Sequence, residues 1–228
     1  MVDLKQSVPR RGFIGGLATG AAALGLSTLI APFRSFAEPK HPPLQSNNSE
    51  FDAWLGKIKG THKQVFDSPF PDGGLPLAWA RVFLMTNAGV GVATDDMCSV
   101  LVLRHDSIPF ALPDPLWAKY KLGEEFKIND GATKSPAVRN PFYNPKPGEL
   151  PLPDMSVGDL LKSGVLIGVC DMALTIYSGK IAKQMNMDGA EVKKEWVAGV
   201  FPGIQIVPSG VLAINRAQQR GCTYCFAG

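Results

Sequence analysis

Four cysteines and one histidine are the residues of this chain whose types and positions could support chemistry. The cysteines are Cys98, Cys170, Cys222 and Cys225, and the histidine is His105. A thiol can act as a nucleophile, carry sulfur, bind a metal or form a disulfide. A histidine beside a thiol can act as a base or a metal ligand. The choice among these roles depends on the elements that position each side chain.

Cys170 ends the uncharged, apolar stretch Gly164-Val-Leu-Ile-Gly-Val-Cys170. Such a run predicts a strand that is buried on both faces of a parallel sheet. A helical pattern follows at once, so Cys170 should lie at the carboxyl edge of the sheet, where open α/β sheets bind ligands. We therefore expect Cys170 to be the sulfur-accepting or nucleophilic thiol. The alternative is a small buried packing residue.

The neighbours of Cys170 have opposite effects on it. A helix that begins at Asp171 or Met172 would present N–H groups and a positive dipole end, which stabilise negative charge on sulfur. The adjacent carboxylate of Asp171 disfavours that charge. His105 follows another expected strand, so it should share the same edge and is the second candidate catalytic residue; a structural histidine is the alternative. Asp67 is interpreted as a turn residue.

Cys222 and Cys225 form a C-x-x-C pair, the spacing of redox dithiols and of half a zinc site. They are the secondary candidates for metal binding, although the chain has no second C-x-x-C to complete a zinc site. In an extended segment their side chains would point to opposite faces. Three interpretations stay open: a functional pair, two unrelated cysteines, or a disulfide from one of them to Cys98 or Cys170. The sequence identifies no cofactor.

Apolar runs alternate with helical patterns along the chain. The expected strands are 63–67, 98–104, 164–170, 203–207 and 222–226. The expected helices are 51–59, 75–88, 115–122, 156–161, 172–184, 190–198 and 208–220. This alternation predicts a three-layer α/β sandwich with a mostly parallel sheet. A proline-rich insertion at 127–155 interrupts this alternation. It is either a functional or interacting loop or a solvated excursion.

The first residues have the features of a targeting signal. Arg10 and Arg11 precede a mildly apolar, Gly/Ala-rich segment, and Ser35-Phe36-Ala37 offers a peptidase site. Residues 1–37 thus resemble a twin-arginine signal, which implies export to the periplasm. The alternative is an uncleaved membrane anchor. A flexible tether is expected at 38–50 and a single domain at 51–228.

The charge balance argues against polyanionic partners. The first 37 residues hold four of the 23 basic and one of the 20 acidic residues, so residues 38–228 carry 19 of each. A nucleic-acid partner is not expected from a nearly neutral domain, and a membrane would be contacted only through an uncleaved signal.

The order of these pieces resembles the DsrE/DsrF-like family of small α/β proteins linked to sulfur metabolism, in its exported branch. The resemblance covers roughly 61–126 and 156–226. It is carried by Val100–Leu112, Gly164–Cys170, Val207–Val211, Ala217–Gly221 and Tyr224.

The resemblance implies a flavodoxin-like sheet and a homo-oligomer, with a trimer favoured. It also implies a cysteine that accepts persulfide sulfur from a donor protein, and Cys170 stands at that position. This chain has Asp171-Met172 where exported members often have a Gly-Asn turn.

Two functions are therefore consistent with the sequence. The first is a sulfur carrier or sulfur-relay protein that acts through Cys170. The second is a non-catalytic oligomeric binding or assembly module whose cysteines are structural. A redox enzyme that uses Cys222 and Cys225 is a third interpretation, so the sequence leaves open whether the protein is an enzyme.

Overall fold

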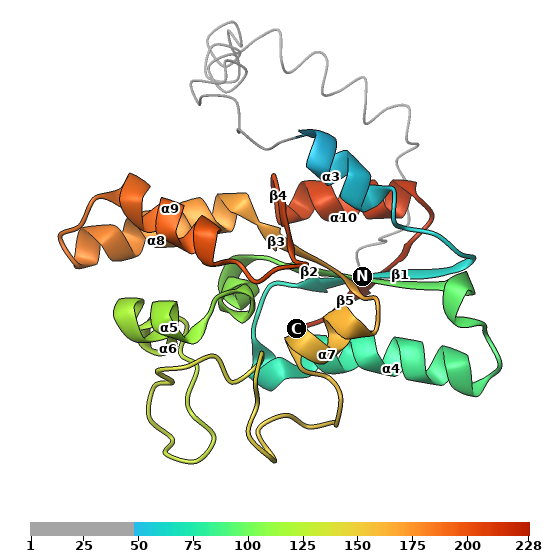
Figure 1. Cartoon of the computed structure of the whole chain (residues 1–228), viewed down its shortest axis with the longest axis horizontal. Helices are drawn as coiled ribbons and strands as arrows, with labels where there is room; N and C mark the ends of the chain where they lie inside the picture. Colours follow the sequence, from blue (N-terminus) through green and yellow to red (C-terminus); the bar gives the residue numbers. More distant parts are fainter. Residues whose placement is uncertain (1–47) are drawn as a thin grey trace, which may run out of the picture. The chain divides into compact units, whose positions relative to one another are not determined.

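The computed structural model describes residues 48–228 (Figure 1). The expected signal at 1–37 and all but the last three residues of the expected tether at 38–50 lie outside the described residues. Within residues 48–228, no helix is long and apolar enough to cross a membrane.

A single five-stranded sheet forms the centre of the domain, with strand order β4-β3-β2-β1-β5. Every neighbouring pair of strands is parallel. The strands are β1 (His62–Ser68), β2 (Met97–Leu103), β3 (Leu166–Cys170), β4 (Gln205–Val207) and β5 (Thr223–Phe226). The predicted flavodoxin-like α/β sandwich is confirmed. Because all strands run the same way, their carboxyl ends lie at one edge of the sheet.

The helices follow the expected order, with shifts of a few residues at their ends. They are α3 (Asn48–Leu55), α4 (Leu75–Gly89), α5 (Asp114–Tyr120), α6 (Leu122–Glu125), α7 (Val157–Lys162), α8 (Asp171–Gln184), α9 (Gly189–Gly199) and α10 (Gly210–Gln219). Three short 3₁₀ helices join them: η2 (Asp72–Gly74), η3 (Thr94–Asp96) and η4 (His105–Ala111). The first helix begins three residues before the expected 51, so 48–50 are helical and not tether.

Successive side chains of the central strands point alternately into two separate hydrophobic cores. In β2, Val100 and Val102 pack with α3 and α10, whereas Leu101 and Leu103 belong to the larger core on the other face. Figure 1 shows α3 and α10 on one side of the sheet and α4 and α7 on the other. A strand buried on both faces needs apolar residues at every position, which explains the uninterrupted Val-Leu-Val-Leu run.

The proline-rich segment 127–155 has no helix or strand beyond one isolated bridge between Asn129 and Pro136. It is nevertheless packed into the larger core through the buried side chains of Ala137, Phe142 and Met155. The alternative of a solvated excursion is therefore wrong.

Asn140 anchors this segment to η4. Its side chain is 1% exposed, and Nδ2 donates to the carbonyl oxygens of Pro109, Phe110 and Leu112 at 3.3, 3.0 and 2.8 Å. Its Oδ1 accepts from the N–H of Phe142 at 2.8 Å. One buried amide thus adds hydrogen bonds to three carbonyls at the end of the short 3₁₀ helix.

Candidate functional site

Cys170 lies where the sequence predicted, at the carboxyl end of β3 and directly before α8. It is the N-cap residue of that helix: its Sγ accepts a hydrogen bond from the N–H of Ala173 at 3.3 Å. The residue is 6% exposed. The first N–H groups of a 14-residue helix therefore surround the sulfur on one side, an arrangement that stabilises negative charge.

The carboxylate of Asp171, which we expected to oppose negative charge on the sulfur, is neutralised by a partner. Nζ of Lys193 lies 3.0 Å from its carboxylate oxygens. Both side chains border a cavity of about 720 Å³ between α9 and β4. The sequence could not show this pairing, because the two residues lie on different helices.

Arg104 lies beside Cys170 at the same edge. Leu103 of β2 pairs with Val169 of β3. Arg104 and Cys170, which follow these two residues, are therefore neighbours across the sheet. The hydrogen bond to Asp67 is the main cause that raises the pKa of Arg104. Arg104 and the N-terminus of α8 are thus both neighbours of this thiol.

Asp67 and Tyr224 hold the guanidinium in place. Nε and Nη2 of Arg104 donate to the two carboxylate oxygens of Asp67 at 2.6 and 2.9 Å. The hydroxyl of Tyr224 donates to Oδ2 of the same carboxylate at 2.9 Å. Asp67 is 4% exposed and belongs to β1, so its interpretation as a turn residue is wrong. The network thereby joins residues of β1 and β5 with the residue that directly follows β2.

The first residue of α10, Gly210, packs against Arg104 of this network. A Cβ atom on Gly210 would lie 2.7 Å from Cβ of Arg104, closer than side chains approach in real proteins. Only a residue without a side chain fits here without a shift of Arg104. Ser209 caps the same helix, because its hydroxyl accepts from the N–H of Leu212 at 3.1 Å.

His105 lies at the same edge in a left-handed backbone conformation, with φ of +50°. Its Nδ1 is 3.1 Å from Oδ1 of Asp106, and the hydroxyl of Tyr177 also donates to that oxygen. Burial, followed by the hydrogen bond to Asp106, raises the pKa of Tyr177 well above its ordinary value. The imidazole lies edge-on to the rings of Phe70 and Tyr177, with centroids 5.7 and 6.0 Å away. The structure therefore places both predicted catalytic residues at one edge.

Cys222 and Cys225 lie on opposite faces, as expected for an extended segment. Cys222 is buried with Cys98 in the core beneath α3 and α10, whereas Cys225 packs against the other core. All four thiols are free. Burial raises the pKa of Cys222 to about 11 and also raises that of Cys98. The pair therefore does not form a redox dithiol.

Cys98 and Cys222 approach each other only across an intervening strand. Cys98 pairs with Lys63 of β1, and Cys222 precedes the pair of Thr223 with Gln64 on the other side of β1. Two strand spacings amount to about 9–10 Å between Cα atoms, beyond the roughly 7 Å that a disulfide tolerates. Within residues 48–228, no group of three or more His, Cys, Asp and Glu side chains could hold a metal ion.

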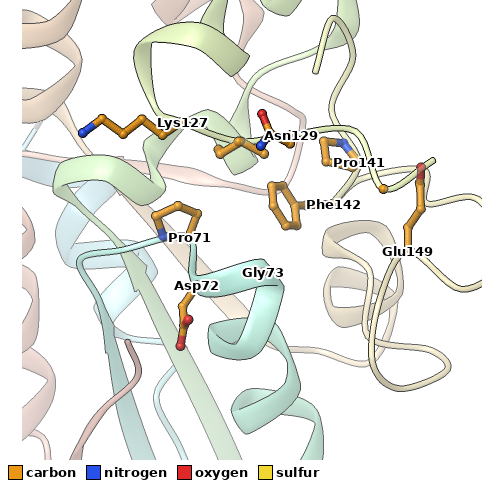
Figure 2. A pocket seen from close by; sticks show the side chains of 10 residues that line it. Pro71, Asp72, Gly73, Lys127, Asn129, Pro141, Phe142 and Glu149 are labelled. Atoms are coloured by element: carbon orange, nitrogen blue, oxygen red, sulfur yellow. The ribbon is translucent and has the colours of Figure 1, made fainter. Parts of the chain in front are cut away.

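A smaller cavity, of about 320 Å³, lies between the loop after β1 and the proline-rich segment (Figure 2). Its lining includes Asp72, Gly73, Lys127, Phe142 and Glu149. Figure 2 shows the Phe142 ring near the middle of this group, with Lys127 and Glu149 on opposite sides. Two carboxylates and one amine give the cavity no preference for anions, so it does not extend the thiol site.

No protein-family model matches the chain, and the comparison with curated proteins gives no significant match. The resemblance to the DsrE/DsrF-like family therefore stays a prediction from short motifs.

Proposed function

We propose that this protein is a sulfur carrier in which the thiol of Cys170 accepts and passes on sulfane sulfur. The observation that carries the proposal is the position of Cys170 at the N-terminus of α8, beside Arg104. A persulfide has a more acidic terminal sulfur than a thiol, so its negative charge gains from a helix N-terminus and a guanidinium.

Loading requires only a sulfur transfer between thiols. A donor persulfide R–S–SH gives its outer sulfur to Cys170, which becomes Cys170–S–SH, and R–SH leaves with the remaining hydrogen. No external oxidant or metal is needed. Arg104 is already oriented by Asp67 and Tyr224, so charge on the outer sulfur meets a partner that does not need to reorganise.

The predicted export signal and the DsrE/DsrF-like resemblance support a periplasmic carrier that works as a homo-oligomer and receives sulfur from a donor protein. The exposed apolar side chains near the carboxyl edge fit an approaching protein: Phe70 is 45% exposed and Phe226 is 52% exposed.

Intact-protein mass spectrometry after incubation with glutathione persulfide tests the proposal. The wild-type protein should gain the mass of a sulfur atom, and peptide mapping should locate it on Cys170. Cys170→Ala should lose this adduct, whereas the matched control Cys98→Ala, at the opposite edge, should keep it. A wild-type protein that stays free of sulfur at Cys170 would falsify the carrier role.

The burial of Cys170 favours a second candidate, an assembly module with structural cysteines. At 6% exposure the sulfur is as enclosed as those of Cys98 and Cys222. Titration of native thiols with an alkylating reagent separates the two functions. A carrier must show a reactive Cys170 in the folded protein, whereas an assembly module should keep it unlabelled.

A further inference from the structure

His105 is held in an unfavourable backbone conformation by its neighbours. A left-handed conformation, with φ of +50°, is unfavourable for a residue other than glycine. The hydrogen bonds on both sides of it enforce this conformation: the N–H of Arg104 donates to Ser68 at 3.0 Å, and the N–H of Asp106 donates to Pro69 at 2.9 Å. The conformation directs a polar ring outward from an otherwise buried 3₁₀ helix.

The ring is oriented so that one nitrogen is occupied and the other is free. Nδ1 faces Oδ1 of Asp106, so a neutral imidazole donates its N–H there and keeps a lone pair on Nε2. Among residues 48–228, Nε2 has no hydrogen-bond partner, and the side chain is 53% exposed. An imidazole with a fixed tautomer and an open Nε2 is equipped to accept a proton.

Asp106 is the carboxylate in contact with this ring, and α8 contributes the neutral hydroxyl of Tyr177. Glu125 of α6 acts on Tyr177 but is paired with Lys180. The positive charge of Arg104 is opposed by Asp67. The loop after β1 presents the uncharged ring of Phe70. Asp106 is thus the carboxylate that fixes the orientation of the ring.

His105 belongs to the same site as Cys170 through two connections. It follows Arg104, the neighbour of Cys170 across the sheet. Its ring also contacts Tyr177, on the helix that Cys170 caps. Both connections place His105 at the same edge of the sheet as Cys170.

We infer that His105 is the general base of sulfur discharge and that the acceptor is itself a thiol, an inference that rests on the proposed carrier function. The acceptor R–SH gives its proton to Nε2, and R–S⁻ attacks the outer sulfur of Cys170–S–SH. The S–S bond breaks, R–S–SH leaves, and the thiolate of Cys170 takes the proton from His105. Sulfur moves from one thiol to another, so no electrons are gained or lost overall.

Separate measurement of loading and discharge tests this role. With an excess of glutathione persulfide, His105→Gln should still load Cys170 fully but more slowly, because loading from this donor is the reverse of discharge to glutathione; full loading also shows that the variant folds. Its discharge to glutathione should slow by about a hundredfold, the usual contribution of a general base. Discharge to sulfite should be unchanged in mildly alkaline buffer, because sulfite is already an anion and gives up no proton.

Two further variants sharpen the test. His62→Gln, a matched substitution at the amino end of β1, should discharge to both acceptors like the wild type. Asp106→Asn should also slow thiol discharge, because the ring loses the carboxylate that fixes its tautomer. A loaded His105→Gln protein that discharges to glutathione at the wild-type rate overturns the inference and leaves the carrier function standing. Failure of the wild type to load overturns both.

Discussion

The guanidinium of Arg104 is bound to both carboxylate oxygens of Asp67, at 2.6 and 2.9 Å. Asp67 is almost fully buried, whereas Arg104 remains partly exposed toward the edge that holds Cys170. The Asp67–Arg104 pair therefore affects both the stability of the sheet and the charge beside the thiol. Substitution of each residue tests these two effects separately.

Asp67→Asn should destabilise the fold by roughly 3 kcal/mol, because it leaves a partly buried guanidinium without its counter-charge. The measurement is urea unfolding followed by circular dichroism. Glu191→Gln is the matched control, since its partner Lys194 is 3.8 Å away on the surface, and it should change stability by less than about 0.5 kcal/mol. Equal effects of the two substitutions would contradict a structural role for the buried pair.

Arg104→Lys should keep the positive charge but lose the two-point contact with Asp67. If a fixed guanidinium stabilises the Cys170 persulfide, sulfur loading should slow by about tenfold, equivalent to about 1.4 kcal/mol in the barrier. The rate comes from the time course of the sulfur adduct in mass spectrometry. Unchanged loading would mean that the fixed orientation of the guanidinium is not used.

Gly210→Ala should destabilise the protein by about 2 kcal/mol, because its Cβ would lie 2.7 Å from Cβ of Arg104 and force the two elements apart. The matched control is Gly179→Ala in the middle of α8, where a Cβ meets nothing within 4 Å. That control should stabilise the helix by up to about 1 kcal/mol. Thermal unfolding of both variants should therefore give shifts of opposite sign.

Asn140→Ala should cost about 2–3 kcal/mol, since it removes buried hydrogen bonds to three carbonyls in and just after η4 and the acceptor for the N–H of Phe142. Asn144→Ala, four residues along the same segment and exposed, should stay within about 0.5 kcal/mol of the wild type. Limited proteolysis should cut the 127–155 segment faster in the first variant only. Equal cleavage would show that this amide does not anchor the segment.

The Cys222 thiol should resist alkylation until the solution approaches pH 11, because burial raises its pKa from 9.0 to about 11. As pH rises, the unfolded chain ionises this thiol first. The stabilisation from its neutral form is therefore complete below about pH 9 and lost as pH rises through about 11. Mass spectrometry of alkylated peptides checks the first statement, and a flatter stability profile of Cys222→Ser in that range checks the second.

Much of the fold could be predicted from the sequence because its strands are buried on both faces. The Val-Leu-Val-Leu run of β2 and the Leu-Ile-Gly-Val-Cys run of β3 have no alternation that could be confused with an amphipathic pattern. The cap of α7 was also predictable, since Ser156 and Asp159 have the spacing of a capping interaction and the hydroxyl of Ser156 accepts the N–H of Asp159.

The network around Cys170 was not predicted, although Cys170 itself was. Asp67 lies on β1, Tyr224 lies on β5 and Arg104 directly follows β2, and nothing local relates them. The available signal was the position of opposite charges at the carboxyl ends of two strands, Asp67 in β1 and Arg104 just after β2. Opposite charges at the carboxyl ends of β1 and β2 can only be paired once the strand order is known.

The place of β5 in the sheet affects how the molecule folds. The side chain of Gln64 on β1 donates to Thr223 on β5, 159 residues away, whereas β1 and β2 are joined by a single helix. Contacts of such high sequence separation are formed late, because the loop-closure entropy must be overcome first. Tyr224 therefore reaches Asp67 in a late step of folding, and an intermediate that lacks β5 would contain Cys170 without the fully restrained Arg104 beside it.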